Sequence, residues 1–137
     1  MTPYPGVVRY ECKKGRRQRQ ELDTRSLPDL SGKRYLITGG NSGIGLDAAK
    51  MLAEAGADII IACRNPRKAE QAASDIARSG PGTVDVVMLD LSSLASVRRA
   101  AEEIHKRWDS LDGLINNAGI MQTPQTATED GFELQLG

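Results

Sequence analysis

Hydrophobic residues along the chain gather in four short runs, and the stretches between them have helical spacing. The runs cover residues 33–39 (KRYLITG), 57–63 (ADIIIAC), 83–91 (TVDVVMLDL) and 111–119 (LDGLINNAG). Apart from Asp58, the run 57–63 is continuously apolar instead of alternating, which is typical of a parallel strand covered on both faces. Strands that alternate with helices predict an α/β fold with a doubly wound parallel sheet, strand order 3-2-1-4, and helices in layers on both sides.

The helix boundaries carry signals of their own. Gly56 stands where a C-terminal glycine ends the first helix, and Asn65 followed by Pro66 is a typical start for the second. Ser92 is expected to cap the third helix, which is predicted to turn five residues toward the sheet: Leu94, Val97, Ala101, Ile104 and Trp108.

Four glycines lie between residues 38 and 45 (TGGNSGIG), directly after the first predicted strand. A strand that ends in glycines and continues into a helix directs the free N–H groups of that helix toward a phosphate. We expect Gly39 to allow the tight turn, Gly43 to let a pyrophosphate approach, and Gly45 to pack the helix closely on the strand. An ordinary strand-to-helix turn is the alternative, but the βαβ context favours dinucleotide binding.

The glycine spacing, G-x-x-x-G-x-G, resembles the T-G-x-x-x-G-x-G motif of the short-chain dehydrogenase/reductase family. Two further motifs match that family, Asp90-Leu91 after the third strand and residues 116–119 (NNAG) after the fourth. Three further segments, ACRN, INNAGIM and TEDGFELQ, are most similar in sequence to the retinol dehydrogenase branch of that family. The resemblance covers residues from about 30 to the C-terminus and implies a Rossmann fold.

The resemblance also implies site residues. Asp90 is expected to accept a hydrogen bond from the adenine amino group, although a helix-capping role is the alternative, and the Leu91 amide is expected to face the ring. Asn116 is expected to tie neighbouring strands together. The full predicted set for the cofactor is Gly39, Asn41, Ser42, Gly43, Ile44, Gly45, Arg64, Asn65, Asp90, Leu91, Asn117, Ala118 and Gly119.

The end of the second strand predicts which nicotinamide cofactor binds. NAD sites usually place Asp or Glu there, which holds the ribose hydroxyls and repels a 2′-phosphate. Here Cys63 takes that place and Arg64 follows, and a guanidinium suits a phosphate. The sequence therefore predicts NADP(H) in preference to NAD(H), with a solvated Arg64 as the alternative. Cys63 is expected to be a packing residue, and His105 to face solvent.

The family resemblance implies a catalytic Tyr with a Lys four residues later, an upstream Ser and an Asn in the helix after the fourth strand. Tyr4, Tyr10 and Tyr35 are the only tyrosines, and none has that lysine. We therefore predict no catalytic residue in this chain. It is expected to be the nucleotide-binding half of a short-chain oxidoreductase for an alcohol/carbonyl pair, truncated and inactive alone, with a retinol-like or other lipophilic substrate. A non-catalytic NADP-binding or partner-binding module is the alternative.

The amino-acid composition limits which classes of binding partner are expected. Eighteen basic and eighteen acidic residues give zero net charge, which disfavours nucleic acid as a partner. Two cysteines lack metal-ligand spacing, so no metal site is predicted and a reducing, cytoplasmic location is favoured. Residues 1–29 are expected to be a basic, poorly ordered arm, with weak membrane contact as an open alternative, or a peripheral membrane location if an anchor was lost.

Residues 30–137 are predicted to form the incomplete Rossmann domain. In that arrangement the fourth strand becomes an open edge, and its uncovered face is expected to expose apolar surface. We expect marginal stability or aggregation unless a protein partner covers this edge.

Overall fold

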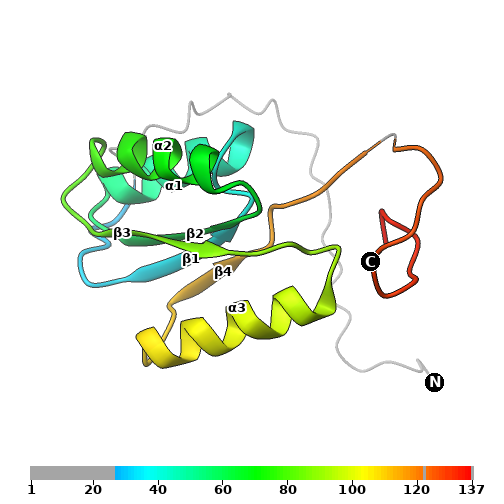
Figure 1. The fold of residues 1–137 in the computed structure, drawn as a ribbon. Coiled ribbons are helices and arrows are strands. Elements are labelled where there is room, and N and C mark those ends of the chain that lie inside the picture. Colours follow the sequence, from blue (N-terminus) through cyan, green and yellow to red (C-terminus); the bar gives the residue numbers. More distant parts are fainter. Residues whose placement is uncertain (1–26, 122, 137) are drawn as a thin grey trace, which may run out of the picture.

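The computed structural model describes residues 27–121 and 123–136, and it shows a single parallel sheet between two layers of helices (Figure 1). The sheet order is β3-β2-β1-β4, so the predicted fold class and strand order are confirmed. Residues 1–26 of the predicted basic arm lie outside the described part of the chain. No helix in the described part is long and apolar enough to cross a membrane.

Each predicted strand forms, although shorter than its hydrophobic run. The strands are β1 (Arg34–Thr38), β2 (Asp58–Cys63), β3 (Val84–Met88) and β4 (Gly113–Ile115). β1 pairs in parallel with β2 on one side and with β4 on the other. Because β4 has only three residues and one strand neighbour in the described part, it is an open edge, as the sequence predicted.

Two helices cover one face of the sheet, α1 (Gly43–Glu54) and α2 (Pro66–Ala77). Apart from Ile76 of α2, the residues that these helices bury are alanines and one glycine, and the two helices pack over three isoleucines of the sheet, Ile37, Ile59 and Ile61. The predicted boundaries hold here. Asn65 caps α2 by accepting a hydrogen bond from the Lys68 N–H at 3.1 Å, and Gly56 follows the end of α1 with φ +96°.

The third helix, α3 (Leu94–Arg107), covers the opposite face. Ile104 and Trp108 pack against the sheet there as predicted. Leu94 and Ala101, however, are exposed, and the buried positions of α3 are Ser96 and Ala100. The prediction was wrong because it counted only apolar residues as inward-facing, so it excluded Ser96 and placed Ala101 in the core in place of its neighbour Ala100.

The cap predicted for α3 was also wrong by one residue. Ser93, not Ser92, caps this helix, and its hydroxyl accepts a hydrogen bond from the Ser96 N–H at 3.4 Å. The first helical N–H group, that of Leu94, donates to the carboxylate of Asp130 at 2.7 Å. A residue 36 positions away therefore completes the start of α3, which sequence patterns close to the helix could not predict.

Trp108 ends α3 at the amino end of the sheet. The Arg107 guanidinium lies 4.2 Å and the Arg34 guanidinium 5.9 Å from the centroid of its ring. Arg107 also forms an ion pair with Asp85 at 2.5 Å. These contacts attach the end of α3 to strands β1 and β3.

Candidate dinucleotide site

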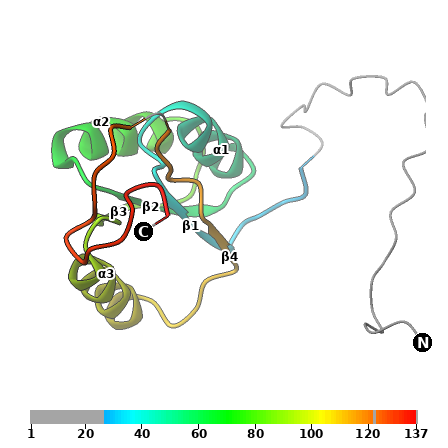
Figure 2. The ribbon, with the colours of Figure 1, turned by 90° about the vertical axis from the view of Figure 1, so that its right-hand side faces the viewer.

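The carboxyl ends of all four strands border one open pocket of about 820 Å³. This volume lies in the range of small-molecule sites in proteins. Figure 2 looks toward this end of the sheet and shows the C-terminal segment crossing in front of it. In a doubly wound sheet, ligands bind at this end, where the connections from neighbouring strands diverge.

The pocket brings together the residues that the sequence predicted for the cofactor. Every one of them lines the pocket except Gly43. Further lining residues were not predicted: Ala62, Cys63, Lys68, Leu89, Ser92, Ile120, Thr123, Leu134 and Gln135. Lys68 could have been found from its place in the first turn of the helix that follows Arg64. The C-terminal residues carry no local signal, because they reach the pocket only through the tertiary fold.

The glycine loop presents the start of α1 to this pocket. Ser42 is the N-cap of α1, but its side chain makes no capping hydrogen bond, and the first turn contains no acidic residue. The side chains of Asn65 and Ser93 do cap α2 and α3. The first N–H groups of α1 and its positive dipole end are therefore available to an anionic group in the pocket.

Two glycines of the loop are required by different geometry. Gly43 has φ +53°, in the left-handed region that favours glycine, and no atom lies within 4 Å of the place where a Cβ would be. At Gly45 a Cβ would lie 2.4 Å from Nδ2 of Asn117 and 2.6 Å from the Gly39 carbonyl oxygen. The close packing predicted for Gly45 is present, but its partners are Asn117 and the Gly39 backbone.

Asn117 holds the glycine loop to β4. Its side-chain Nδ2 donates to the Thr38 carbonyl oxygen at 3.1 Å, and its backbone N–H donates to the Thr38 hydroxyl at 3.1 Å. The strand-tying role expected of Asn116 therefore falls to Asn117, while the Asn116 side chain is exposed. The prediction missed this because β4 has only three residues. So short a strand does not indicate from sequence which of the two neighbouring asparagines faces β1.

Asp90 follows the end of β3 by two residues and borders the pocket. Its Oδ1 accepts hydrogen bonds from the hydroxyl and the backbone N–H of Ser92, at 2.7 and 2.9 Å. These bonds hold the pKa of Asp90 below its usual value, and the charge of Arg64 lowers it further. The Asp90 side chain does not cap α3, because Ser93 and Asp130 do. The helix-capping alternative for Asp90 is thus wrong.

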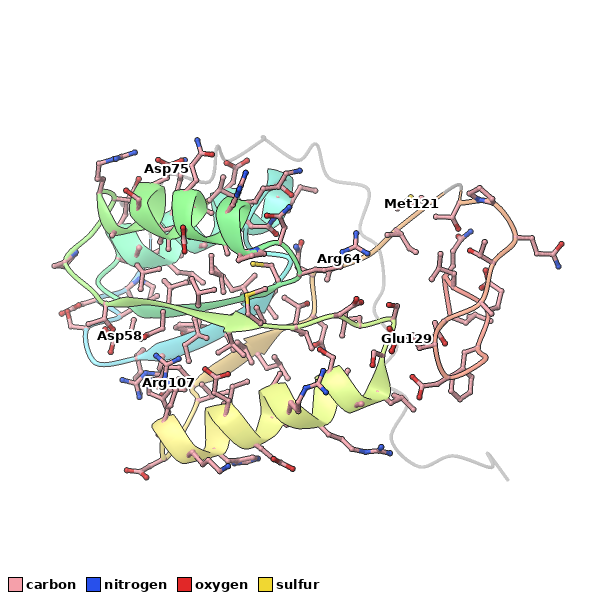
Figure 3. The ribbon with its side chains drawn as sticks, viewed as in Figure 1. Asp58, Arg64, Asp75, Arg107, Met121 and Glu129 are labelled. Atoms are coloured by element: carbon pink, nitrogen blue, oxygen red, sulfur yellow. The ribbon has the colours of Figure 1, made fainter. Side chains whose placement is uncertain are left out.

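The end of β2 supplies the basic side of the pocket. Cys63 is buried, with 5% of its surface exposed, and burial raises the pKa of its thiol, so it is a packing residue as predicted. Arg64 and Lys68 are exposed and both line the pocket. Figure 3 shows Arg64 at the carboxyl end of the sheet, whereas Asp58 and Arg107 lie at the opposite end.

Sequence comparison identifies the family. A short chain dehydrogenase profile matches residues 33–134, which is most of the chain. This chain belongs to the short-chain dehydrogenase family. That family binds nicotinamide dinucleotides, so the glycine loop and the four-strand pocket have the place and composition of its cofactor site.

Individual members resemble the chain over this same region. Human retinol dehydrogenase 13 is 46% identical over 113 residues, which are 82% of this chain and 34% of that protein. A crystal structure of an uncharacterized protein from Mycobacterium paratuberculosis is 45% identical, with a TM-score of 0.71 over 82% of this chain and 39% of its own. The Pseudomonas aeruginosa RhlG/NADP complex is 37% identical, with a TM-score of 0.63 over 67% and 36%. The chain thus spans about a third of the length of the relatives it matches.

The described residues contain no second cluster of side chains that suggests a metal or catalytic site. In residues 27–121 and 123–136 no group of three or more His, Cys, Asp or Glu side chains could hold a metal ion. Tyr35, the tyrosine of the described part, lies in β1 with its ring against Gly113, away from the pocket. His105 is exposed, as predicted.

Proposed function

We propose that this chain binds NADP(H) as the nucleotide-binding part of a short-chain oxidoreductase acting on an alcohol/carbonyl pair. The observation that carries this proposal is the uncapped start of α1 behind the glycine loop, at a pocket bordered by all four strand ends. A bound NADP(H) supplies the hydride-transfer chemistry. The chain's own residues supply the phosphate-binding N–H groups, the carboxylate of Asp90 and the basic side chains near β2.

The preference for NADP(H) over NAD(H) is supported by the charges around the end of β2. The position usually held by Asp or Glu in NAD sites is Cys63, whose thiol is neutral and buried. Arg64 and Lys68 both border the pocket, and neither pairs with a carboxylate within 4 Å among the described residues. Two cations that form no ion pair with a carboxylate favour a bound 2′-phosphate.

The substrate class is proposed from the relatives. Several curated relatives are named retinol dehydrogenases, and we propose a lipophilic alcohol or carbonyl compound for the oxidoreductase to which this chain corresponds. Because no Tyr-x-x-x-Lys occurs in the 137 residues, we expect this chain alone to bind cofactor without turnover. A non-catalytic NADP-binding or partner-binding module is the second candidate, favoured by the open edge at β4.

Titration of the purified chain with NADPH and, separately, with NADH tests the proposal, using nucleotide fluorescence as the signal. We expect NADPH to bind more tightly than NADH, by about tenfold, because of its additional charged phosphate contact. Equal binding of both would overturn the NADP assignment and leave a general dinucleotide site. Binding of neither would overturn the proposed function altogether.

A further inference from the structure

Three serines at the start of α3 surround Asp90, and each has a different role. The Ser92 hydroxyl and N–H both donate to Oδ1 of Asp90. The Ser96 hydroxyl accepts a hydrogen bond from the Asp90 backbone N–H at 3.0 Å, and Ser96 is only 9% exposed. Ser93 caps α3 by accepting the Ser96 N–H, and its hydroxyl makes no hydrogen bond to Asp90. Both the backbone and the carboxylate of Asp90 are therefore fixed in place.

This arrangement makes the two oxygens of Asp90 unequal. Oδ1 receives two hydrogen bonds, which can use both of its lone pairs. Oδ2 receives no hydrogen bond from the described residues, and Asp90 borders the pocket. One carboxylate oxygen is thus held by the protein and the other remains available to a ligand.

The family resemblance implies that the Asp90 carboxylate accepts a hydrogen bond from the adenine amino group. We propose that Ser92 is a positioning residue that fixes this carboxylate, so that Oδ2 discriminates against a purine without an exocyclic amino group. This inference rests on the proposed function, since it concerns the base of the nucleotide bound in the same pocket. Adenine offers an amino N–H donor to a carboxylate oxygen, whereas hypoxanthine places a carbonyl oxygen at the same position. A fixed Oδ2 rejects that carbonyl, because two acceptors then face each other.

Freedom of the carboxylate would weaken this selection. Hypoxanthine carries an N1–H donor beside its carbonyl, and a carboxylate that can turn could accept from that donor instead. The Ser92 hydroxyl opposes such a turn through its short bond to Oδ1. The low pKa of Asp90 agrees with this role, because the group stays an ionised acceptor at neutral pH.

The role of Ser92 can be separated from the stability of α3. The helix is capped by Ser93 and Asp130, so removing the Ser92 hydroxyl leaves both caps intact. The other contact of Ser92 is made by its backbone carbonyl, which accepts the Glu129 N–H at 3.0 Å. A Ser92→Ala change therefore removes one hydroxyl bond to Asp90 and retains the backbone contacts.

The test compares the binding of NADPH with that of its hypoxanthine analogue, deamino-NADPH. Both nucleotides are titrated into the full chain and into Ser92→Ala, Ser92→Thr and Ser93→Ala. We expect Ser92→Ala to reduce the preference for NADPH over deamino-NADPH about fivefold, the effect of losing one hydrogen bond of ordinary strength. Ser92→Thr keeps a hydroxyl and should retain the preference. Ser93→Ala should lower the thermal midpoint and leave the preference unchanged.

The outcomes distinguish this inference from the proposed function. An unchanged preference in Ser92→Ala, or an equal loss of affinity for both nucleotides, would overturn the positioning role while nucleotide binding stands. A wild-type chain that binds both nucleotides equally well would also overturn the positioning role of Ser92 without affecting the proposed function. A wild-type chain that binds neither would overturn the proposed function and this inference together. Ser92→Gly removes the same hydroxyl and replaces Ser92→Ala if that variant does not fold.

Discussion

Thr38 and Asn117 join the ends of two neighbouring strands through a reciprocal pair of hydrogen bonds. The Thr38 hydroxyl accepts the Asn117 N–H, and the Asn117 side chain donates to the Thr38 carbonyl oxygen, each at 3.1 Å. The same hydroxyl accepts the Ala118 N–H at 3.0 Å. This pair fixes the glycine loop against the segment that follows β4, and both sides of that junction border the pocket.

Replacement of Thr38 by Val should destabilise the fold at this junction. Thr38 is 7% exposed, and its hydroxyl accepts from two backbone N–H groups. The Asn117 N–H would keep its second acceptor, the Ile115 carbonyl oxygen at 3.0 Å, but the Ala118 N–H would lose its acceptor. We expect the free energy of unfolding to fall by about 2 kcal/mol, the cost of leaving a part-buried donor unpaired. Denaturant unfolding followed by circular dichroism measures this. Thr38→Ser keeps the hydroxyl, so its free energy of unfolding should fall by less than half of that amount. An equal fall in both variants would contradict the hydrogen-bond explanation.

A Gly45→Ala change should disturb the loop even though alanine favours helices. Its Cβ would collide with the Asn117 side chain and with the Gly39 carbonyl oxygen. We expect a loss of about 2 kcal/mol of stability and a weakening of NADPH binding, since the loop would have to move. Gly119→Ala is the control for stability, because no atom lies within 4 Å of the Cβ it would add. The same stability change in both variants would disprove the packing argument.

Introducing a carboxylate by Cys63→Asp should shift the cofactor preference from NADPH toward NADH. The new group would repel a 2′-phosphate and could hold the ribose hydroxyls. Nucleotide fluorescence titration should show the NADPH/NADH affinity ratio falling by about tenfold or more. Arg64→Ala is the companion variant. It should weaken NADPH and leave NADH unchanged, and an unaltered affinity ratio in both variants would remove the NADP assignment.

Asp58 should contribute stability that depends on pH. It accepts hydrogen bonds from the Thr83 N–H and hydroxyl, both at 2.8 Å, and pairs with Arg34 at 3.3 Å. The Thr83 backbone bond is the first cause of its lowered pKa. A lowered folded-state pKa means that the stabilisation is complete at pH values well above the usual carboxyl pKa of 3.8 and is lost as pH falls through the folded-state pKa.

We therefore expect Asp58→Asn to lower the free energy of unfolding by about 1 kcal/mol at pH 7, with a smaller difference from wild type below pH of about 4. Unfolding curves measured at several pH values test the sign. Asp109→Asn is the control, since the Asp109 side chain makes no hydrogen bond to other described residues. A difference that grows on acidification would show that the bonds to Asp58 are not responsible.

The open edge at β4 should favour self-association. Leu114, in the centre of β4, is 56% exposed, and Leu94 of α3 is 40% exposed. We expect the wild-type chain to form oligomers at micromolar concentration and Leu114→Lys to reduce them, with a stability change within about 0.5 kcal/mol because the side chain is already solvated. Sedimentation velocity measures the size distribution. A wild-type chain that is monomeric and unfolds in a sharp, cooperative thermal transition would contradict self-association through β4.

The sequence was sufficient for those features that depend on local chemistry. The glycine loop, the Asn65-Pro66 start of α2 and the parallel strand order all follow from residues that are neighbours in the chain. The strand-tying asparagine and the capping Asp130 were not predicted correctly, because their partners lie 79 and 36 positions away. The inward face of α3 was misjudged for a related reason. The rotation of α3 on the sheet decides that Ser96 and Ala100 are buried and Ala101 is exposed, and the spacing of apolar residues alone does not determine that rotation.

Trp108 is the single tryptophan of the chain, and two guanidinium groups lie near its ring at the end of α3 farthest from the nucleotide pocket. In the absence of nucleotide, its emission should therefore respond to separation of the helix from the sheet. Reduced nicotinamide absorbs light at the wavelengths where tryptophan emits, so a bound NADPH should quench Trp108 by energy transfer across the sheet. One native side chain can thus report folding in the free chain and occupancy of the pocket in the liganded chain.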